Sequence, residues 1–192
     1  MSEAVVRRIA EHFGEKVLRT FNERGDDGIY VARENLVEIA RFCRDDEEAD
    51  LKMPVTLTCV DYLGQEPRFE LVYVLYSVKK KHRIQIRVRV PEEDPVVPSL
   101  TAIYRGLDYW ERYVWDMYGI RFTDREKPLK RLWMWEGFEG HPLRKDFPLR
   151  GRKGQIPELD IQDIYRGPGP GPNSRPASRA AQPRPSQLPI VK

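Results

Sequence analysis

The chain has 192 residues, of which 40% are hydrophobic and 33% are charged, and its formal net charge is +3. A chain of this length can bury one sizeable core, and so small a net charge, with both signs interspersed, argues against a dedicated nucleic-acid binder. The two cysteines, Cys43 and Cys59, form no Cys-x-x-Cys pair, which argues against a disulfide framework and against a cysteine-ligated metal or iron–sulfur cluster.

The chain has no apolar run of the length that crosses a bilayer and no apolar signal core near its first residues. We therefore expect a cytosolic protein, or one that is attached to a membrane only through its partners. We also expect both cysteines to be reduced and buried, where a thiol behaves as a small apolar group.

The first third of the chain alternates helical and strand patterns. Apolar residues at helical spacing predict a helix, then two strands joined by a turn, then a second helix. These elements are expected at residues 3–13, 17–22, 29–31 and 33–44, with the turn at 25–28. Gly14 is expected to end the first helix, and the acidic residues 45–50 are expected to form a solvated loop.

Three better-defined strands follow at residues 55–62, 69–78 and 84–90. The first is apolar at successive positions, which predicts a strand buried on both sides, and the third alternates as a half-buried strand does. The short links between them favour an antiparallel meander. The basic turn at 79–82 fits an exposed hairpin tip better than an anion site.

Residues 91–98 are expected to form a stiff acidic connector, and Ser99 can cap the helix that follows, which Gly119 can end. Together the elements predict an α+β fold, with helices packed on a mostly antiparallel sheet. We divide the chain into a globular domain at residues 1–121, an extended segment at 122–149 and a Pro/Gly-rich tail at 150–192. The tail is predicted to be disordered or wrapped on a partner.

The helix before Gly119 carries an acid on its apolar face. Glu111 falls among the apolar positions of the helical wheel, whereas Asp116 falls on the opposite side. A buried carboxylate is costly unless it is paired, so we predict a basic partner, with Arg144 and Arg131 as the leading candidates. A structural ion pair is the favoured interpretation, and an acid with a raised pKa in proton chemistry is the alternative.

The C-terminal segment, residues 122–149, contains a run that neither a helix nor a central strand accommodates. Residues 139–148 combine two prolines, a glycine and alternating charges. We therefore expect this run to bind either the globular part of this protein or another chain. All four tryptophans lie between Trp110 and Trp135, flanked by arginines, a composition typical of interface cores.

Three motifs carry a resemblance to a known family. They are Val90-Pro91-Glu92-Glu93-Asp94-Pro95, then Glu111-Arg112 with Trp115-Asp116-Met117-Tyr118-Gly119-Ile120-Arg121-Phe122, then Glu139-Gly140-His141-Pro142-Leu143-Arg144-Lys145-Asp146-Phe147-Pro148. From about residue 54 to residue 149 the chain resembles the C subunit of the proton-pumping NADH–quinone oxidoreductase, respiratory complex I. One departure concerns a glycine–histidine–proline sequence that is usual in the family after the position of Phe122. In this chain the proline is present as Pro128, but the glycine and the histidine are absent.

The resemblance implies a non-catalytic subunit of the hydrophilic arm, on the cytoplasmic face of a prokaryotic inner membrane and peripheral to it. It implies no catalytic, metal or cofactor-binding residue in this chain, with NAD, FMN, iron–sulfur clusters and quinone held by partner subunits. The expected partners are the large quinone-site subunit and neighbouring iron–sulfur subunits. The residues expected to bind a partner or to support the segment are Glu111, Asp116, Arg131, His141, Arg144, Lys145 and Asp146.

Three alternatives remain. The chain could be the equivalent subunit of a related membrane-bound hydrogenase or of a quinone reductase fed by another donor. It could be a stand-alone anion- or RNA-binding module that uses Arg83, Arg87, Arg89 and the basic tail, although the exposed faces of the strands show no aromatic pair flanked by glycine. A hydrolase that uses His141 and Asp146 is the third, but no motif supplies its nucleophile.

Overall fold

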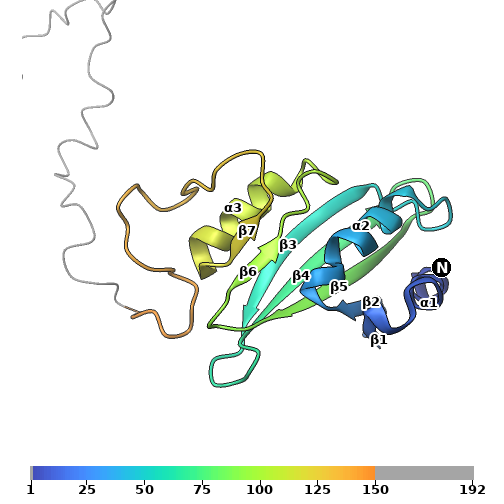
Figure 1. Ribbon diagram of the computed structural model, residues 1–192, viewed down its shortest axis with the longest axis horizontal. Helices are drawn as coiled ribbons and strands as arrows, with labels where there is room; N and C mark the ends of the chain where they lie inside the picture. Colours follow the sequence, from blue (N-terminus) through green and yellow to red (C-terminus); the bar gives the residue numbers. More distant parts are fainter. Residues whose placement is uncertain (1, 150–192) are drawn as a thin grey trace, which may run out of the picture. The chain divides into compact units, whose positions relative to one another are not determined.

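The computed structural model describes residues 2–149, and in this range a mixed five-stranded sheet forms the centre of the fold (Figure 1). The strand order is β1-β2-β5-β4-β3. The helices and strands are α1 (Ser2–Phe13), β1 (Val17–Glu23), β2 (Asp26–Val31), α2 (Leu36–Asp45), β3 (Met53–Asp61), β4 (Phe69–Ser77), β5 (His82–Val90), β6 (Val96–Pro98), α3 (Leu107–Tyr118) and β7 (Arg121–Thr123). The predicted α+β class is confirmed.

The N-terminal elements form largely where the periodicity predicts them. The first helix buries Val5, Val6 and Ile9 on one face and ends at Phe13, before Gly14 with φ +52°. The predicted turn at 25–28 is wrong, because the chain reverses already at Arg24 and Gly25, which both have positive φ. Two successive residues with positive φ match the twist of the flanking strands, so Asp26 to Gly28 are free to extend β2.

The three later strands form the expected antiparallel meander, since β3 pairs with β4 and β4 pairs with β5. The sheet is completed by a parallel pairing of β2 with β5. The prediction that the first of the three is buried on both sides is wrong. β3 is the last strand in the sheet order, and Met53, Val55 and Val60 on it are exposed.

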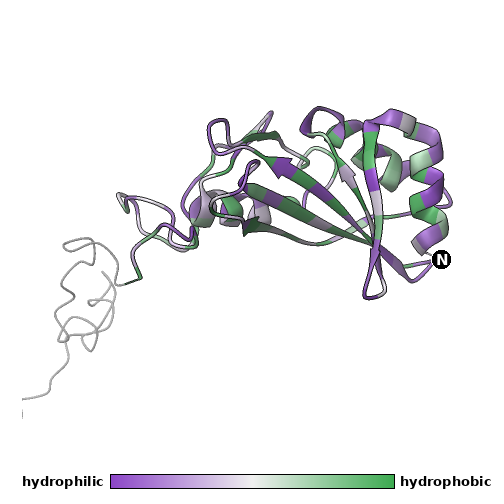
Figure 2. Cartoon of the chain, turned by 90° about the horizontal axis from the view of Figure 1, so that it is seen from below, coloured by the Kyte–Doolittle hydropathy of each residue, from purple (hydrophilic) through white to green (hydrophobic). Residues whose placement is uncertain are grey.

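The core lies between the sheet and the helices. Hydrophobic and hydrophilic residues alternate along the strands in Figure 2, and the burial of β5 alternates as predicted. Tyr73 and Phe69 on β4 are among the largest fully buried side chains. At the β1–β2 end of the sheet α1 contacts both strands, whereas α3 packs near β3 and β7 (Figure 1).

Two predictions around the basic hairpin need correction. Ala49 and Asp50 are buried, so the acidic stretch 45–50 is only partly a solvated loop. His82 does not lie in the hairpin tip but begins β5 and is 6% exposed. Its Nε2 lies 2.9 Å from the carbonyl oxygen of Ala49, so the ring ties the strand to the loop that follows α2.

The long helix begins later than predicted. Ser99 does not cap it; α3 starts at Leu107, after a series of turns in which Tyr104 N–H donates to the Leu100 carbonyl. The apolar residues in these turns have helical spacing although the turns form no helix. This spacing explains why Leu100 and Ile103 were predicted to be part of the helix. The expected connector also contains a strand, since β6 pairs in parallel with β7.

The helix ends as predicted. Gly119 has φ +82° and its N–H donates to the Trp115 carbonyl, which closes the last turn in the left-handed conformation that favours glycine. The described residues 2–149 all belong to one compact unit. The tail at 150–192, with its predicted disorder, lies outside the described residues.

Candidate functional site

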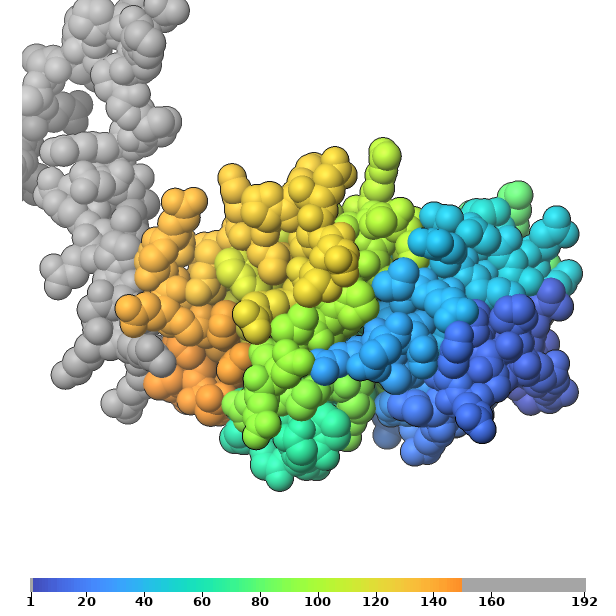
Figure 3. Space-filling view, viewed as in Figure 1, coloured from blue at the N-terminus to red at the C-terminus, as the bar shows by residue number. Residues whose placement is uncertain are grey.

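The C-terminal segment forms no helix or strand after β7, and it folds over α3 of its own chain. In Figure 3 its yellow-to-orange atoms gather at one end of the molecule, away from the blue N-terminal residues. Because the segment has no regular hydrogen bonding of its own, its position depends on side chains that meet its backbone and on ion pairs. Four sets of contacts supply these hydrogen bonds and ion pairs.

The first contact involves Glu111, which is fully buried as predicted. The predicted partners, Arg144 and Arg131, are wrong: the guanidinium that reaches the carboxylate belongs to Arg125, which also bonds Asp108 at 2.6 Å. A helical wheel predicts which face of α3 is buried. It does not predict which residue of the C-terminal segment contacts that face.

Three groups therefore satisfy the Glu111 carboxylate. Besides Arg125, the Ser99 hydroxyl donates to Oε2 at 2.8 Å and the Leu100 N–H donates to Oε1 at 2.9 Å. Burial raises the pKa of Glu111, and these donors act against that rise. Ser99 thus has a role that the sequence did not indicate: it supports the buried acid.

The second contact is centred on Asp116, which the helical wheel placed on the exposed side. It is instead 0% exposed, because the C-terminal segment covers that side of α3. One oxygen accepts a hydrogen bond from Arg131 Nη1 at 2.7 Å. The other accepts the backbone N–H groups of three successive residues, Leu132, Trp133 and Met134, at 3.0, 2.8 and 3.1 Å.

Asp116 therefore organises the turn at 131–134. Burial alone would raise the pKa of its carboxyl, but the bonds from Arg131 and the three amides outweigh burial and lower the pKa. Arg131 in turn donates to the carbonyls of Phe138 at 2.6 Å and Gly140 at 3.2 Å. One buried carboxylate and one arginine thus fix both arms of the loop.

The third contact caps the C-terminal end of α3. The last carbonyls of a helix lack partners within the helix, and here residues 141–144 supply them. The His141 Nδ1 lies 3.0 Å from the Asp116 carbonyl oxygen, and the Arg144 Nε donates to the Tyr118 carbonyl at 2.5 Å. Leu143 N–H donates to the Met117 carbonyl at 3.1 Å. Burial, together with Arg144 and Arg131, lowers the pKa of His141.

The fourth contact joins the segment to the sheet. Arg68 is 3% exposed and binds both oxygens of buried Asp61, at 2.8 Å each, while also bonding Glu92 and Asp146. Asp61 further accepts the backbone N–H of Lys145 at 2.8 Å. The bond from Arg68 is the leading cause that lowers the pKa of Asp61, and the same holds for Asp146.

The predicted site residues thus separate into distinct places. Asp116, Arg131, His141 and Arg144 come together around the end of α3, whereas Asp146 and the backbone of Lys145 meet the sheet. Sequence reasoning missed Asp61, Arg68 and Arg125. An acid at the end of β3 and an arginine seven residues later, immediately before β4, could have indicated the first two, but nothing in the sequence pointed to Arg125.

The segment exposes apolar side chains on its outer side. Trp133 is 63% exposed, Leu143 44% and Trp135 40%, although the turns that carry them are fixed by the contacts above. Trp135 stacks edge-on against Phe138, with ring centroids 4.9 Å apart. Large exposed apolar residues on a fixed backbone are typical of protein–protein contact sites.

Both cysteines of the chain lie within the described residues. Cys43 and Cys59 are both buried and unpaired with each other, and burial raises the pKa of the Cys43 thiol to about 12. Within residues 2–149 no group of three or more His, Cys, Asp or Glu side chains is placed to hold a metal ion. No helix in that range is both long and apolar enough to span a membrane.

Comparisons with known proteins agree with the resemblance seen in the motifs. Residues 29–153 match the family model described as respiratory-chain NADH dehydrogenase, 30 Kd subunit. The C subunit of the NADH-quinone oxidoreductase of Roseiflexus sp. (strain RS-1) is 46% identical over 145 residues, which cover 76% of this chain and 83% of the relative. The C subunit of the NADH-quinone oxidoreductase of Geobacter sulfurreducens is 38% identical over 147 residues, covering 76% and 89%.

Two solved structures share the fold. A trypsin-resistant fragment of Nqo5 superposes with a TM-score of 0.56 at 25% identity, covering 67% of this chain and 100% of the fragment. A chain of the archaeal membrane-bound sulfane sulfur reductase superposes with a TM-score of 0.66 at 24% identity, covering 77% and 85%. The chain belongs to the family of the 30 Kd subunit of respiratory-chain NADH dehydrogenase, which confirms the resemblance predicted from its motifs.

Proposed function

We propose that this chain is the C subunit of an NADH–quinone oxidoreductase, a structural subunit of the hydrophilic arm that supports electron transfer from NADH to quinone without chemistry of its own. The observation that carries the proposal is the C-terminal segment. Buried acids on α3 and β3 hold its backbone through hydrogen bonds, yet Trp133 and Leu143 on it are exposed.

The segment is proposed to dock on the large quinone-site subunit. A binding surface that is already ordered loses little conformational freedom on association, so rigid apolar anchors raise affinity. Asp116 and Arg131 supply that order, and Arg144 holds the far arm of the loop against the end of α3. On this view the ionic residues shape the interface, while the exposed aromatic and leucine side chains contact the partner.

The cofactors and location follow from the same proposal. NAD, FMN, iron–sulfur clusters and quinone are assigned to partner subunits, and this chain is placed at the cytoplasmic face of the inner membrane of a prokaryote, held there by the complex. The buried acids Glu111 and Asp116 each form an ion pair with an arginine of the same chain, so their charges stabilise its own fold.

The RNA-binding alternative finds no support in the basic face of β5. Arg83 bonds Asp26 at 2.6 Å, Arg87 pairs with Glu23 at 3.3 Å, and Arg89 lies 3.5 Å from Glu70. Arginines that already face carboxylates of their own sheet are poorly available to phosphates. The equivalent subunit of a related membrane-bound complex stays the alternative, and the proteins that co-purify distinguish the two.

The test is to tag the chain, solubilise the membranes gently and identify what co-purifies. The proposal expects a large quinone-site subunit together with a flavin subunit that binds NADH. Recovery of a hydrogenase large subunit without any NADH-binding chain would assign the alternative. Arg144→Ala in the same strain should lower the amount of assembled complex and leave the quinone reduction per assembled complex unchanged.

A further inference from the structure

The ring of His141 lies at the end of α3 and keeps one nitrogen open to solvent. Its Nδ1 lies 3.0 Å from the Asp116 carbonyl oxygen, which can only accept, so Nδ1 carries the proton of the neutral ring. Among the described residues Nε2 has no hydrogen-bond partner, and it does not belong to the buried polar atoms without one, so solvent reaches it. The ring can therefore take up a second proton at Nε2.

A fixed positive charge lies beside this nitrogen. His141 Nε2 and Arg144 Nη2 are each 2.6 Å from the position that a Cβ on Gly119 would take, so the two nitrogens are near neighbours. The guanidinium is held on two sides, because its Nε donates to the Tyr118 carbonyl at 2.5 Å and its Cζ lies 5.1 Å from the centroid of the Phe69 ring. A guanidinium keeps its charge throughout the pH range in which proteins fold. A proton at Nε2 is thus placed against a charge that cannot leave.

The charges of the surrounding loop and of α3 do not remove this repulsion. Arg131, on the other arm of the loop, adds to it. The Asp116 carboxylate attracts a proton on the ring, but its oxygens already accept hydrogen bonds from Arg131 and from three backbone N–H groups. Burial, followed by Arg144 and Arg131, lowers the pKa of His141 against the pull of Asp116.

Two further acids of this region face other groups. Asp61 of β3 accepts hydrogen bonds from Arg68 and from the Lys145 N–H. Glu139, two residues before His141, is exposed, where water weakens the attraction of its charge. The closed segment therefore binds a proton at His141 less readily than a histidine in water does.

We propose that His141 is an acid-operated release of the C-terminal segment: uptake of a proton at Nε2 frees residues 141–144 from the end of α3. In the released state the ring and the Arg144 guanidinium both reach water, so their repulsion is relieved. That state binds the proton at the ordinary histidine pKa of 6.5, whereas the closed state binds it at a lower pKa. Release is thus favoured increasingly as the pH falls below 6.5 and levels off below the pKa of the closed state.

Release removes the cap of α3 and the fixed position of Leu143. The Leu143 N–H donates to the Met117 carbonyl in the closed state, so this hydrogen bond reports directly on the cap. Where the segment docks on a partner, the same proton weakens docking. That consequence rests on the proposed function, whereas the release itself is a property of this chain alone.

The test uses the natural full-length chain without partners. NMR of ¹³C-labelled histidine rings gives the pKa of His141, and amide hydrogen exchange of Leu143, corrected for the intrinsic rate at each pH, gives the equilibrium constant of opening. The expected result is a pKa below 6.5 and an opening constant that rises as the pH falls below 6.5. The full rise should equal ten raised to the difference between 6.5 and the measured pKa.

The control amide is that of Asp46, which donates to the Phe42 carbonyl at the end of α2. Its opening constant should not follow the Leu143 curve. A His141 pKa at or above 6.5, or a Leu143 opening constant that stays unchanged below pH 6.5, would overturn the proposal. Both measurements need no substitution, so they decide even if a variant at position 141 fails to fold.

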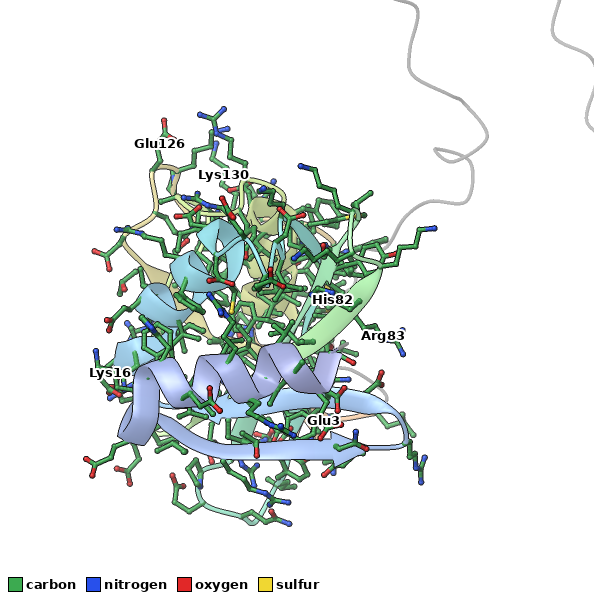
Figure 4. All side chains as sticks on the ribbon, turned by 90° about the vertical axis from the view of Figure 1, so that its right-hand side faces the viewer. Glu3, Lys16, His82, Arg83, Glu126 and Lys130 are labelled. Carbon is green, nitrogen blue, oxygen red and sulfur yellow. The ribbon has the colours of Figure 1, made fainter. Side chains whose placement is uncertain are left out.

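Two matched variants identify the group that takes up the proton. His141→Asn keeps an amide donor near the place of Nδ1 but cannot become charged, so the pH dependence of Leu143 opening should vanish. His12→Asn should retain it, because His12 is exposed and stacks on Phe42, with ring centroids 4.4 Å apart. In Figure 4 the helix α1, which carries His12, lies at the front, whereas Lys130 of the C-terminal segment lies at the upper edge. A pH dependence that persists in His141→Asn contradicts the proposal.

Discussion

Asp116 and Arg131 are fifteen positions apart in the chain, yet their side chains form a 2.7 Å ion pair that joins α3 to the loop covering it. The acid is fully buried, and the arginine also holds two carbonyls of the loop. The pair therefore determines where residues 131–140 lie, and with them the exposed Trp133 and Trp135.

We predict that Asp116→Ala lowers the free energy of unfolding by about 3–5 kcal/mol, since it leaves Arg131 and three backbone N–H groups without their acceptor. Asp108→Ala is the control on the same helix: its side chain is partly exposed and Arg125 retains Glu111 without it. That control should lose about 1 kcal/mol or less. Urea unfolding of both variants measures the difference, and equal losses would show that Asp116 does not organise the loop.

A double-mutant cycle tests the partner of Glu111. Arg125→Met and Glu111→Gln should show a coupling free energy of about 1–3 kcal/mol, because each removes the charge that the other faces. The same cycle between Arg144→Met and Glu111→Gln should be additive within about 0.5 kcal/mol, since Arg144 bonds the Tyr118 carbonyl instead. Coupling to Arg144 in place of Arg125 would restore the partner expected from the sequence.

Acid stability should depend on Asp116. Its pKa is lowered below the ordinary 3.8 in the folded chain, so between those two values the unfolded chain binds more protons. The stabilisation is present above pH 3.8 and is lost as the pH falls through the folded value. Asp116→Asn should thus flatten the acid limb of a plot of unfolding free energy against pH. An unchanged slope would contradict the lowered pKa.

Glu111 should change the pH dependence of the unfolding free energy in the opposite sense to Asp116, because burial raises the pKa of Glu111 above the ordinary 4.5. The folded chain then binds more protons than the unfolded chain between 4.5 and the raised value, so this contribution weakens as the pH rises. In Glu111→Gln the acid limb should become steeper than in the natural chain, since the opposing contribution of Glu111 is gone while acids with lowered pKa values, such as Asp61 and Asp116, remain.

Gly119 should tolerate no side chain. A Cβ there would lie 2.6 Å from Arg144 Nη2 and from the His141 ring, and its φ of +82° disfavours other residues. Gly137→Ala is the control: its φ is +90°, but its Cβ would meet nothing within 4 Å. We predict a loss of about 1 kcal/mol for Gly137→Ala and a clearly larger one for Gly119→Ala, measured by thermal unfolding. Equal losses would mean that Arg144 and His141 do not pack against the end of α3.

How far the sequence predicts this fold depends on the range of each interaction. Local patterns were sufficient for α1, for the alternation along β5 and for the glycine that ends α3. The parallel pairing of β2 with β5 and that of β6 with β7 join distant residues, and no local pattern encodes them. The turns after Ser99 mimic helical spacing, so the start of α3 was placed too early.

The residues of the candidate site were predictable only in part, since Asp61, Arg68 and Arg125 were missed, and its contacts were less predictable still. The motifs pointed to Asp116 and Arg144, whereas Arg131 was named as a candidate partner of Glu111. The apolar face of α3 showed that Glu111 is buried. Which arginine meets which acid depends on the path of a segment without helix or strand, and such a path follows from packing rather than from periodicity. Their role in binding a partner stays a prediction.

The most direct test of the central claim is the double variant Trp133→Ala/Leu143→Ala, compared with Leu18→Ala, a residue that is 65% exposed at the far end of the sheet. The isolated chains should unfold within about 0.5 kcal/mol of the natural protein, because all three side chains are exposed. The double variant should lose most of the co-purifying quinone-site subunit, whereas Leu18→Ala should retain it. Full recovery of the complex with the double variant would contradict a docking role for the C-terminal segment.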